Sequence, residues 1–221
     1  MPERGPVGVL GGTFDPIHLG HLRLAEEARE SLGLAELRLI PSGQPPHRLA
    51  PSTSADDRLA MVRLAIAGNP RLVVDDGEVR AQQKSYTVLT LERLRDELGP
   101  ARPLVLILGA DAFEGLPSWH RWQDIFELAH IAVANRPGFA PHGRRWPGTL
   151  SPALDAACRD RLGTNLAALA AAPAGRVAAF DMTPLAVSAS LIRDLLKAGH
   201  SARYLLPDSV LNYIEAHRLY R

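Results

Sequence analysis

Short apolar segments alternate with helix-like segments along most of this chain. The apolar runs lie at residues 7–10, 36–40, 72–75, 104–108, 131–134 and 175–181. Helix patterns follow them at residues 22–28, 54–67, 88–98, 188–197 and 209–217, and an alanine-rich stretch at 152–172 predicts one more. Alternation of this kind is typical of a parallel sheet with crossover helices, so we predict an α/β fold.

The composition favours an ordinary globular protein of one domain. The chain has 221 residues, of which 46% are hydrophobic and 22% charged, and its net charge is +1. We therefore expect residues 1–221 to form a single domain, with a C-terminal helical part from about residue 185 packed on it. The near-neutral charge argues against a nucleic-acid partner. The sequence leaves the oligomeric state open, a homo-oligomer included.

Two features of the sequence indicate the cellular location: the single cysteine and the lack of long apolar runs. Cys158 is the one cysteine, so an intramolecular disulfide is excluded, and a reducing cytosol suits the chain. We expect Cys158 to be a packed small residue. No run approaches the roughly 18 apolar residues of a membrane span, so we expect no membrane contact and a cytoplasmic protein.

Residues 11–21 carry the strongest indication of chemistry. Gly11 and Gly12 follow the first apolar run, and glycine lets a ligand approach the backbone closely. His18 and His21 lie where the next helix is expected to begin. A helix N-terminus offers free N–H groups and a positive dipole end to phosphate. The stretch therefore predicts a phosphate-binding turn from strand to helix.

The two histidines allow more than one interpretation. At a spacing of three they project from one helix face, where a phosphate could hold the imidazoles protonated as donors. They could also ligate zinc, but such a site needs at least three protein ligands and no other His or Cys is near in the sequence. A structural role in hydrogen bonding is the other alternative. The glycine patterns of dinucleotide-binding folds and of P-loops are missing here.

The apolar run at 104–108 repeats this arrangement. It leads directly into Gly109-Ala110-Asp111, a glycine and an acid at the end of a buried strand. Ligands of open parallel sheets bind at the carboxyl ends of the strands. We therefore predict that Gly109 and Asp111 form a second wall of the site.

Two separated motifs resemble the nucleotidyltransferase superfamily that carries the H-x-G-H signature. The first is His18-Leu19-Gly20-His21. The second, Ser188-Ala189-Ser190-Leu191-Ile192-Arg193, resembles the S-x-T-x-x-R motif, with Ser190 in place of threonine. From the residues alone, Ser188 could cap a helix or bind phosphate, and the Arg193 fork suits phosphate oxygens. The resemblance implies a doubly wound, Rossmann-like parallel sheet.

Further segments narrow the resemblance to the bacterial nicotinate-nucleotide adenylyltransferases. They are Pro45-Pro46-His47-Arg48, Ser85-Tyr86-Thr87, Gly109-Ala110-Asp111, Pro117-Ser118-Trp119, Arg136-Pro137-Gly138, Leu205-Leu206-Pro207 and Tyr213-Ile214. This resemblance implies transfer of the adenylyl group of ATP, with Mg²⁺, to nicotinate mononucleotide. The alternatives are the same chemistry on nicotinamide mononucleotide or phosphopantetheine, and a nucleotide-binding sensor without catalysis.

The resemblance also implies a role for each motif residue. The catalytic residues are His18, His21 and Arg193, and no protein residue is assigned as a metal ligand. The residues expected to bind ATP are Gly11, Gly12, Thr13, Phe14, His18, His21, Gly109, Asp111, Ser188 and Arg193. Those expected to bind nicotinate mononucleotide are Asp15, His47, Arg48, Tyr86, Thr87, Trp119 and Arg136. Trp119 could instead be a core tryptophan, since Trp122 and Phe126 follow at helical spacing.

Overall fold

A parallel sheet forms the centre of the molecule. The computed structural model describes residues 5–45, 51–81, 83–135, 150–163 and 165–221. Within these residues the sheet has six strands in the order β3-β2-β1-β4-β5-β6. The strands are β1 (Val7–Gly12), β2 (Glu36–Pro41), β3 (Leu72–Val74), β4 (Leu104–Gly109), β5 (His130–Asn135) and β6 (Val177–Asp181). This is the strand order of a doubly wound fold, so the predicted fold class is confirmed.

Helices connect the strands and continue beyond the last one. The α-helices are α1 (Leu19–Ser31), α2 (Ala55–Ala65), α3 (Gly77–Arg80), α4 (Thr87–Leu98), α5 (Ala110–Glu114), α6 (Ile125–Leu128), α7 (Pro152–Cys158), α8 (Ala189–Lys197) and α9 (Asp208–Ala216). Short 3₁₀ helices are η1 (Leu116–Ser118), η2 (Trp122–Asp124) and η4 (Leu166–Ala170). Ser54 caps the N-terminus of α2, because its hydroxyl accepts a hydrogen bond from the Asp57 N–H.

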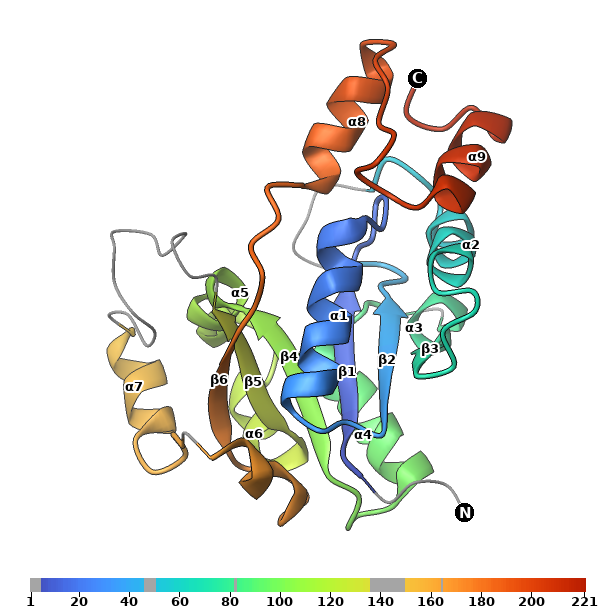
Figure 1. Ribbon diagram of the computed structural model, residues 1–221. Coiled ribbons are helices and arrows are strands. Elements are labelled where there is room, and N and C mark those ends of the chain that lie inside the picture. The colour runs from blue at the N-terminus through green and yellow to red at the C-terminus, as the bar shows by residue number, and fades with distance from the viewer. Residues whose placement is uncertain (1–4, 46–50, 82, 136–149, 164) are drawn as a thin grey trace.

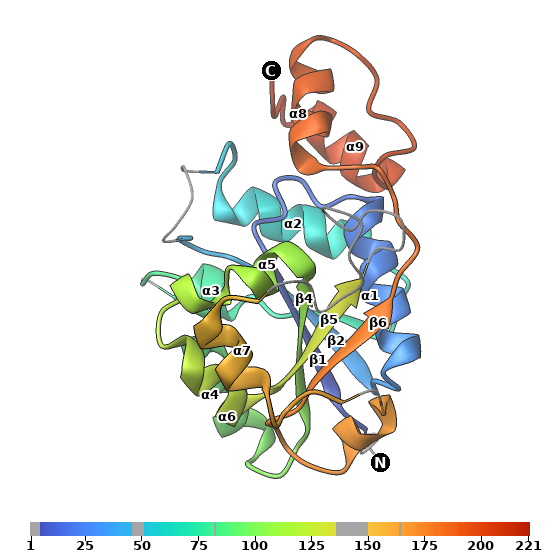
Figure 2. The same cartoon turned by 90° about the vertical axis from the view of Figure 1, so that its left-hand side faces the viewer.

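Two hydrophobic cores lie on the two faces of the sheet. Helix α1 covers one face, and α4 and α6 cover the other (Figures 1 and 2). The first core joins α1 and α2 to the sheet through side chains such as Ala28 and Met61, both fully buried. The second joins α4, α5 and α6 through Leu91, Phe113 and Phe126. Burial on both faces explains why the central strands are almost continuously apolar.

Helices α8 and α9 lie beyond the carboxyl ends of the strands (Figures 1 and 2). Helix α9 packs on α2, and its residues Val210, Leu211 and Ile214 belong to the same core as α1. At this contact the Tyr213 hydroxyl donates a hydrogen bond of 2.9 Å to Asp57. The C-terminal helices therefore cover the end of the sheet where ligands of this fold class bind.

The alanine-rich stretch at 152–172 differs from its prediction as one helix. Helix α7 ends at Cys158, and η4 forms separately after it. Between them the backbone pairs with β6: the Val177 N–H donates to Arg161 O at 2.8 Å, and the Gly163 N–H donates to Val177 O at 2.9 Å. Pairing with a strand outweighs the helix preference of alanine here. Cys158 is buried on α7, as predicted.

No helix in the described part of the chain has both the length and the apolar composition needed to cross a membrane.

Candidate active site

The neighbouring strands β1 and β4 part at their carboxyl ends. Strand β1 is in register with β2 over all six of its residues, but its ladder with β4 covers only three, ending at Val9 opposite Leu106. The strand order reverses at this pair. In doubly wound sheets the crevice at such a reversal is where ligands bind.

The glycines at this crevice leave room for a ligand. A Cβ atom built on Gly11 or on Gly109 would meet no other atom within 4 Å. A Cβ on Gly12 would instead come within 2.9 Å of the Phe14 ring. The space beside Gly11 and Gly109 is thus open, whereas Gly12 is needed for the turn itself.

Phe14 shapes the turn from inside the core. Its backbone has a φ of 50°, in the left-handed region, and its side chain is 3% exposed. The ring contacts His21 edge to face, with centroids 5.1 Å apart. Because the Phe14 side chain lies in the core, contact with a nucleotide would come through its backbone. Thr13, next to it, lies at the same strand end and is half-buried.

The two histidines meet at the start of α1. His18 is the N-cap residue, and the rings of His18 and His21 are stacked with centroids 3.7 Å apart. The His18 backbone N–H donates to Nδ1 of His21 at 3.3 Å. Because Nδ1 of His21 is the acceptor of this bond, Nε2 is the ring nitrogen left to donate to a ligand. The predicted helix start and the shared face of the two imidazoles are both present.

Arg193 joins the second motif to the first. Its Nη1 donates to the backbone oxygen of Asp15 at 2.7 Å, and its Nη2 donates to Oγ of Ser190 at 3.2 Å. Ser188 is the N-cap of α8, where its hydroxyl accepts from the Leu191 N–H at 3.1 Å. The N-termini of α1 and α8 therefore both lie near the end of β1.

The Asp15 carboxylate is turned into the protein. It is 6% exposed and accepts hydrogen bonds from the Ser52 N–H at 2.7 Å, the Thr53 hydroxyl at 2.8 Å and the Tyr220 hydroxyl at 2.7 Å. The peptide bond from Asp15 to Pro16 is cis. The structure thus gives this carboxylate three protein partners.

A buried arginine ties the ends of β1 and β2 together. Arg58 on α2 is 1% exposed, and its guanidinium donates to the backbone oxygens of Thr13 at 2.8 Å, Ser42 at 2.6 Å and Gly43 at 3.1 Å. Burial lowers the Arg58 pKa, and the charge of Asp15 opposes that shift. The Arg58 guanidinium therefore lies against the backbone of the turn after β1.

The segments around Tyr86 and Trp119 approach each other at the other side of the crevice. The rings of Tyr86 and His120 lie 4.5 Å apart between centroids. Tyr86 is the N-cap of α4, Thr87 begins that helix, and Trp119 is half-buried against the second core. Asp111 is exposed in the first turn of α5, after β4. Each segment thus presents side chains at the carboxyl ends of the strands.

The sequence pattern of the family described as cytidylyltransferase-like matches residues 9–195, which include both motifs. The chain belongs to this family. Strand β1 and helix α8 lie at the two ends of the match, and Arg193 of α8 bonds to the turn after β1.

Similar proteins share the family and most of the length. A protein of Dechloromonas aromatica (strain RCB), named "Probable nicotinate-nucleotide adenylyltransferase", is 56% identical over 216 residues, which cover 98% of each chain. A protein of the same name from Pseudomonas putida (strain W619) is 49% identical over 97% of this chain and 94% of its own.

A solved structure supports the fold. It is entitled "Plasmodium falciparum nicotinic acid mononucleotide adenylyltransferase complexed with NaAD", and it matches with a TM-score of 0.72. The match covers 98% of this chain and 97% of the other at 15% identity, so it is evidence for the fold.

Three expected site residues lie outside the described residues: His47, Arg48 and Arg136. The segment before the first of these is described. Its Gly43 and Gln44 N–H groups donate to the Ser85 hydroxyl at 2.9 and 3.2 Å. Residues 43 and 44, which precede the proline-rich motif segment, therefore lie beside Ser85.

Sequence reasoning missed several residues of this site. Arg58 reads as an ordinary helix cation, and Tyr220 lies 205 positions from its partner Asp15. Ser52, Thr53 and His120 also carry no motif. The local pattern that could have pointed to this region is Ser54 followed by Asp56 and Asp57, which is typical of a helix start.

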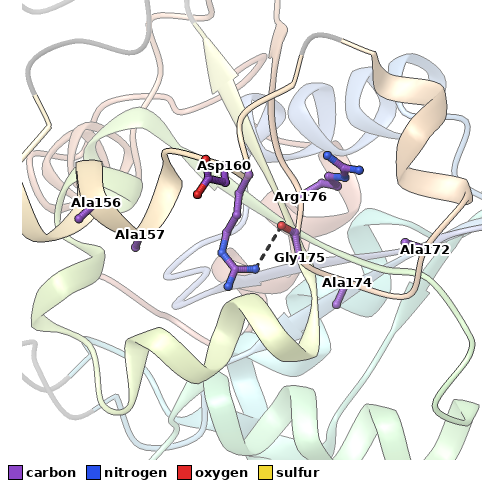
Figure 3. Close-up of a pocket in the computed structure, with 8 residues that line it drawn as sticks. Ala156, Ala157, Asp160, Ala172, Ala174, Gly175 and Arg176 are labelled. Carbon is purple, nitrogen blue, oxygen red and sulfur yellow. Dashed lines mark hydrogen bonds between the residues drawn. The ribbon is translucent and has the colours of Figure 1, made fainter.

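A cavity of about 600 Å³ lies elsewhere, at the amino end of β6 (Figure 3). Its lining includes Ala172, Gly175 and Arg176, and Arg161 donates to the Gly175 oxygen at 3.4 Å. Alanines share the lining with three charged residues, Asp160, Arg161 and Arg176. It lies at the opposite end of the sheet strands from the family motifs.

Proposed function

We propose that this chain transfers the adenylyl group of ATP to nicotinate mononucleotide, forming nicotinate adenine dinucleotide and pyrophosphate. The observation that carries the chemistry is the bond from Arg193 to the Asp15 oxygen, which places both family motifs at one strand end. The acceptor follows from relatives of that name at 56% and 49% identity over nearly the whole chain.

The triphosphate of ATP would lie across the crevice between Gly11 and Gly109. The positive end of the α1 dipole, Nε2 of His21 and the Arg193 guanidinium supply positive potential and donors for phosphate oxygens. His18, as N-cap of α1, stacks against His21 and fixes its ring. Thr13 and Phe14 would contribute backbone groups, and Ser188 would contribute the N-terminus of α8.

The reaction is a displacement at phosphorus. An oxygen of the acceptor's 5′-phosphate attacks the α-phosphorus of ATP, the bond from that phosphorus to the oxygen bridging to the β-phosphorus breaks, and pyrophosphate leaves. No covalent enzyme intermediate or strong base is needed. Catalysis then rests on in-line positioning and on donors that stabilise the charge of the transition state.

Magnesium would arrive with the triphosphate. Among the described residues no group of three or more His, Cys, Asp or Glu side chains could hold a metal ion by itself. Mg²⁺ commonly binds through substrate phosphates with one or two carboxylates, and Asp111 is an exposed carboxylate at this strand end. When bound, the ion would neutralise charge on the phosphates. No protein cage is required.

Nicotinate mononucleotide would lie on the α4 side of the crevice. Tyr86, Thr87 and Trp119 are assigned to it, and an aromatic contact with the pyridine ring is worth about 1 kcal/mol. His47, Arg48, Arg136 and Asp15 remain predictions for this substrate. A cytoplasmic location remains a prediction from the composition.

Acceptor specificity tests the proposal. The purified protein with ATP and Mg²⁺ is given nicotinate mononucleotide, nicotinamide mononucleotide or phosphopantetheine, and pyrophosphate release is followed with mass analysis of the product. We expect the highest kcat/KM with nicotinate mononucleotide. A higher value for either other acceptor, or no release by folded protein with any of them, would refute the proposal.

A further inference from the structure

Tyr220 reaches from the segment after α9 to the turn after β1. Its hydroxyl donates to Oδ1 of Asp15 at 2.7 Å and lies 3.4 Å from the Thr53 hydroxyl oxygen. Burial raises the Tyr220 pKa far above its ordinary value, so the hydroxyl keeps its proton at any working pH. Its backbone φ of 62° lies in the left-handed region. Tyr220 is therefore a permanent donor to the Asp15 carboxylate.

Asp15 is held from three parts of the chain. Thr53 and the Ser52 N–H bond to its carboxylate from the segment before α2, and Tyr220 bonds to it from beyond α9. Arg193 bonds to its backbone oxygen from α8. One residue thus accepts hydrogen bonds from the segment before α2, from α8 and from the segment after α9.

The position of Asp15 fixes the histidines. It lies three residues before His18, and Ile17 between them is fully buried. The first N–H of α1, that of Leu19, is bonded to the Leu205 oxygen at 3.0 Å. A shift of Asp15 would be passed along this short, anchored segment to the His18 and His21 rings.

We infer that Tyr220 is a positioning residue for the phosphate-binding turn, acting through Asp15 on His18, His21 and Arg193. This inference rests on the proposed function. Its hydroxyl touches no substrate. The hydrogen bond holds the turn in position. Its loss would shift the phosphate donors His18, His21 and Arg193 and so lower the turnover.

Tyr213 offers a matched control in the same helical region. Its hydroxyl also donates to an aspartate, Asp57, at 2.9 Å. That bond fastens α9 to α2 and makes no contact with the turn after β1. Tyr213→Phe and Tyr220→Phe thus remove the same group and the same kind of bond, and only the second touches Asp15.

The experiment compares the two variants with the wild type. Steady-state pyrophosphate release gives kcat and the KM for ATP, and thermal melting checks the fold. A misplacement of about 1 Å can cost about 100-fold in rate, so we expect Tyr220→Phe to lose about tenfold or more in kcat. We expect Tyr213→Phe to keep a kcat close to that of the wild type, because its bond to Asp57 does not reach the turn after β1. Thr53→Val, which removes the second hydroxyl on Asp15, should resemble Tyr220→Phe.

A second readout needs no reaction. Amide hydrogen exchange of residues 13–19 in ligand-free protein should be faster in Tyr220→Phe than in the wild type and unchanged in Tyr213→Phe. Equal effects of the two tyrosine variants on kcat, or unchanged exchange and kcat in Tyr220→Phe, would overturn the inference. If the wild type forms no dinucleotide, the proposed function fails, and the exchange comparison still decides whether Tyr220 holds the turn.

Discussion

Replacing Arg58 by methionine should destabilise the protein strongly. The methionine keeps much of the apolar stem and removes the guanidinium, which donates to the carbonyl oxygens of Thr13, Ser42 and Gly43 at 2.6 to 3.1 Å. Because the arginine is 1% exposed, water cannot readily replace those donors. The ends of β1 and β2 would lose their shared support.

The size of the effect follows from two opposing contributions. Each hydrogen bond from a charged donor is worth about 1.5–3 kcal/mol. Against these losses stands the cost of dehydrating a buried charge, several kcal/mol, which the variant avoids. The net loss in the free energy of unfolding should be about 3 kcal/mol, near the lower limit for breaking a buried charged contact. For a chain of this size that lowers Tm by about 6–12 °C.

Arg63→Met on the same helix is the control. The Arg63 side chain is 56% exposed and pairs with Asp76 at 2.8 Å. An exposed ion pair contributes about 0–1 kcal/mol, so this variant should lose at most 1 kcal/mol on that scale. Urea denaturation of both variants and the wild type measures the difference. If Arg58→Met lost no more stability than Arg63→Met, the buried guanidinium would not be what holds the two strand ends.

Three further predictions concern single side chains. His18→Ala should reduce turnover by about 100-fold or more while ATP affinity in calorimetry changes by less than about fivefold, as for a group that acts in the transition state; equal losses in both would show a ground-state role. Arg193→Lys should lower kcat/KM by about tenfold, because an ammonium cannot span the Asp15 oxygen and Ser190 as the fork does; full activity would contradict this. Burial raises the pKa of Cys158 to about 11, so the folded protein should not react with a thiol reagent at pH 8, and rapid labelling would contradict its packing.

The sheet and most helices were predictable because each strand and helix carries its own periodicity. The run at 104–108 and the capped helix from Ser54 are local patterns, and the structure reproduces them. The stretch at 152–172 failed because its backbone pairs with β6 around Gly163, a contact that composition does not encode. Short helices such as α5 and α6 also left no clear pattern.

Residues of the candidate site could be named from the sequence only where they belong to a recognisable motif. Gly11, His18, His21 and Arg193 could be named from spacing and resemblance. Arg58 could not, because a helix arginine is usually exposed, and its burial depends on three carbonyl groups from distant segments. The bond from Tyr220 to Asp15 likewise spans 205 positions, a separation at which sequence pattern gives no register.

The most direct test of the account is ATP binding by Gly11→Ala. A Cβ atom there meets no protein atom within 4 Å, and the residue has no left-handed φ, so the fold should be unaffected. Gly163→Ala is equally unhindered, and it lies beside β6 away from the motifs. If the phosphates lie against Gly11, calorimetry should show ATP affinity reduced about tenfold or more in Gly11→Ala and unchanged in Gly163→Ala. Wild-type affinity in a folded Gly11→Ala protein would contradict a nucleotide site between β1 and β4.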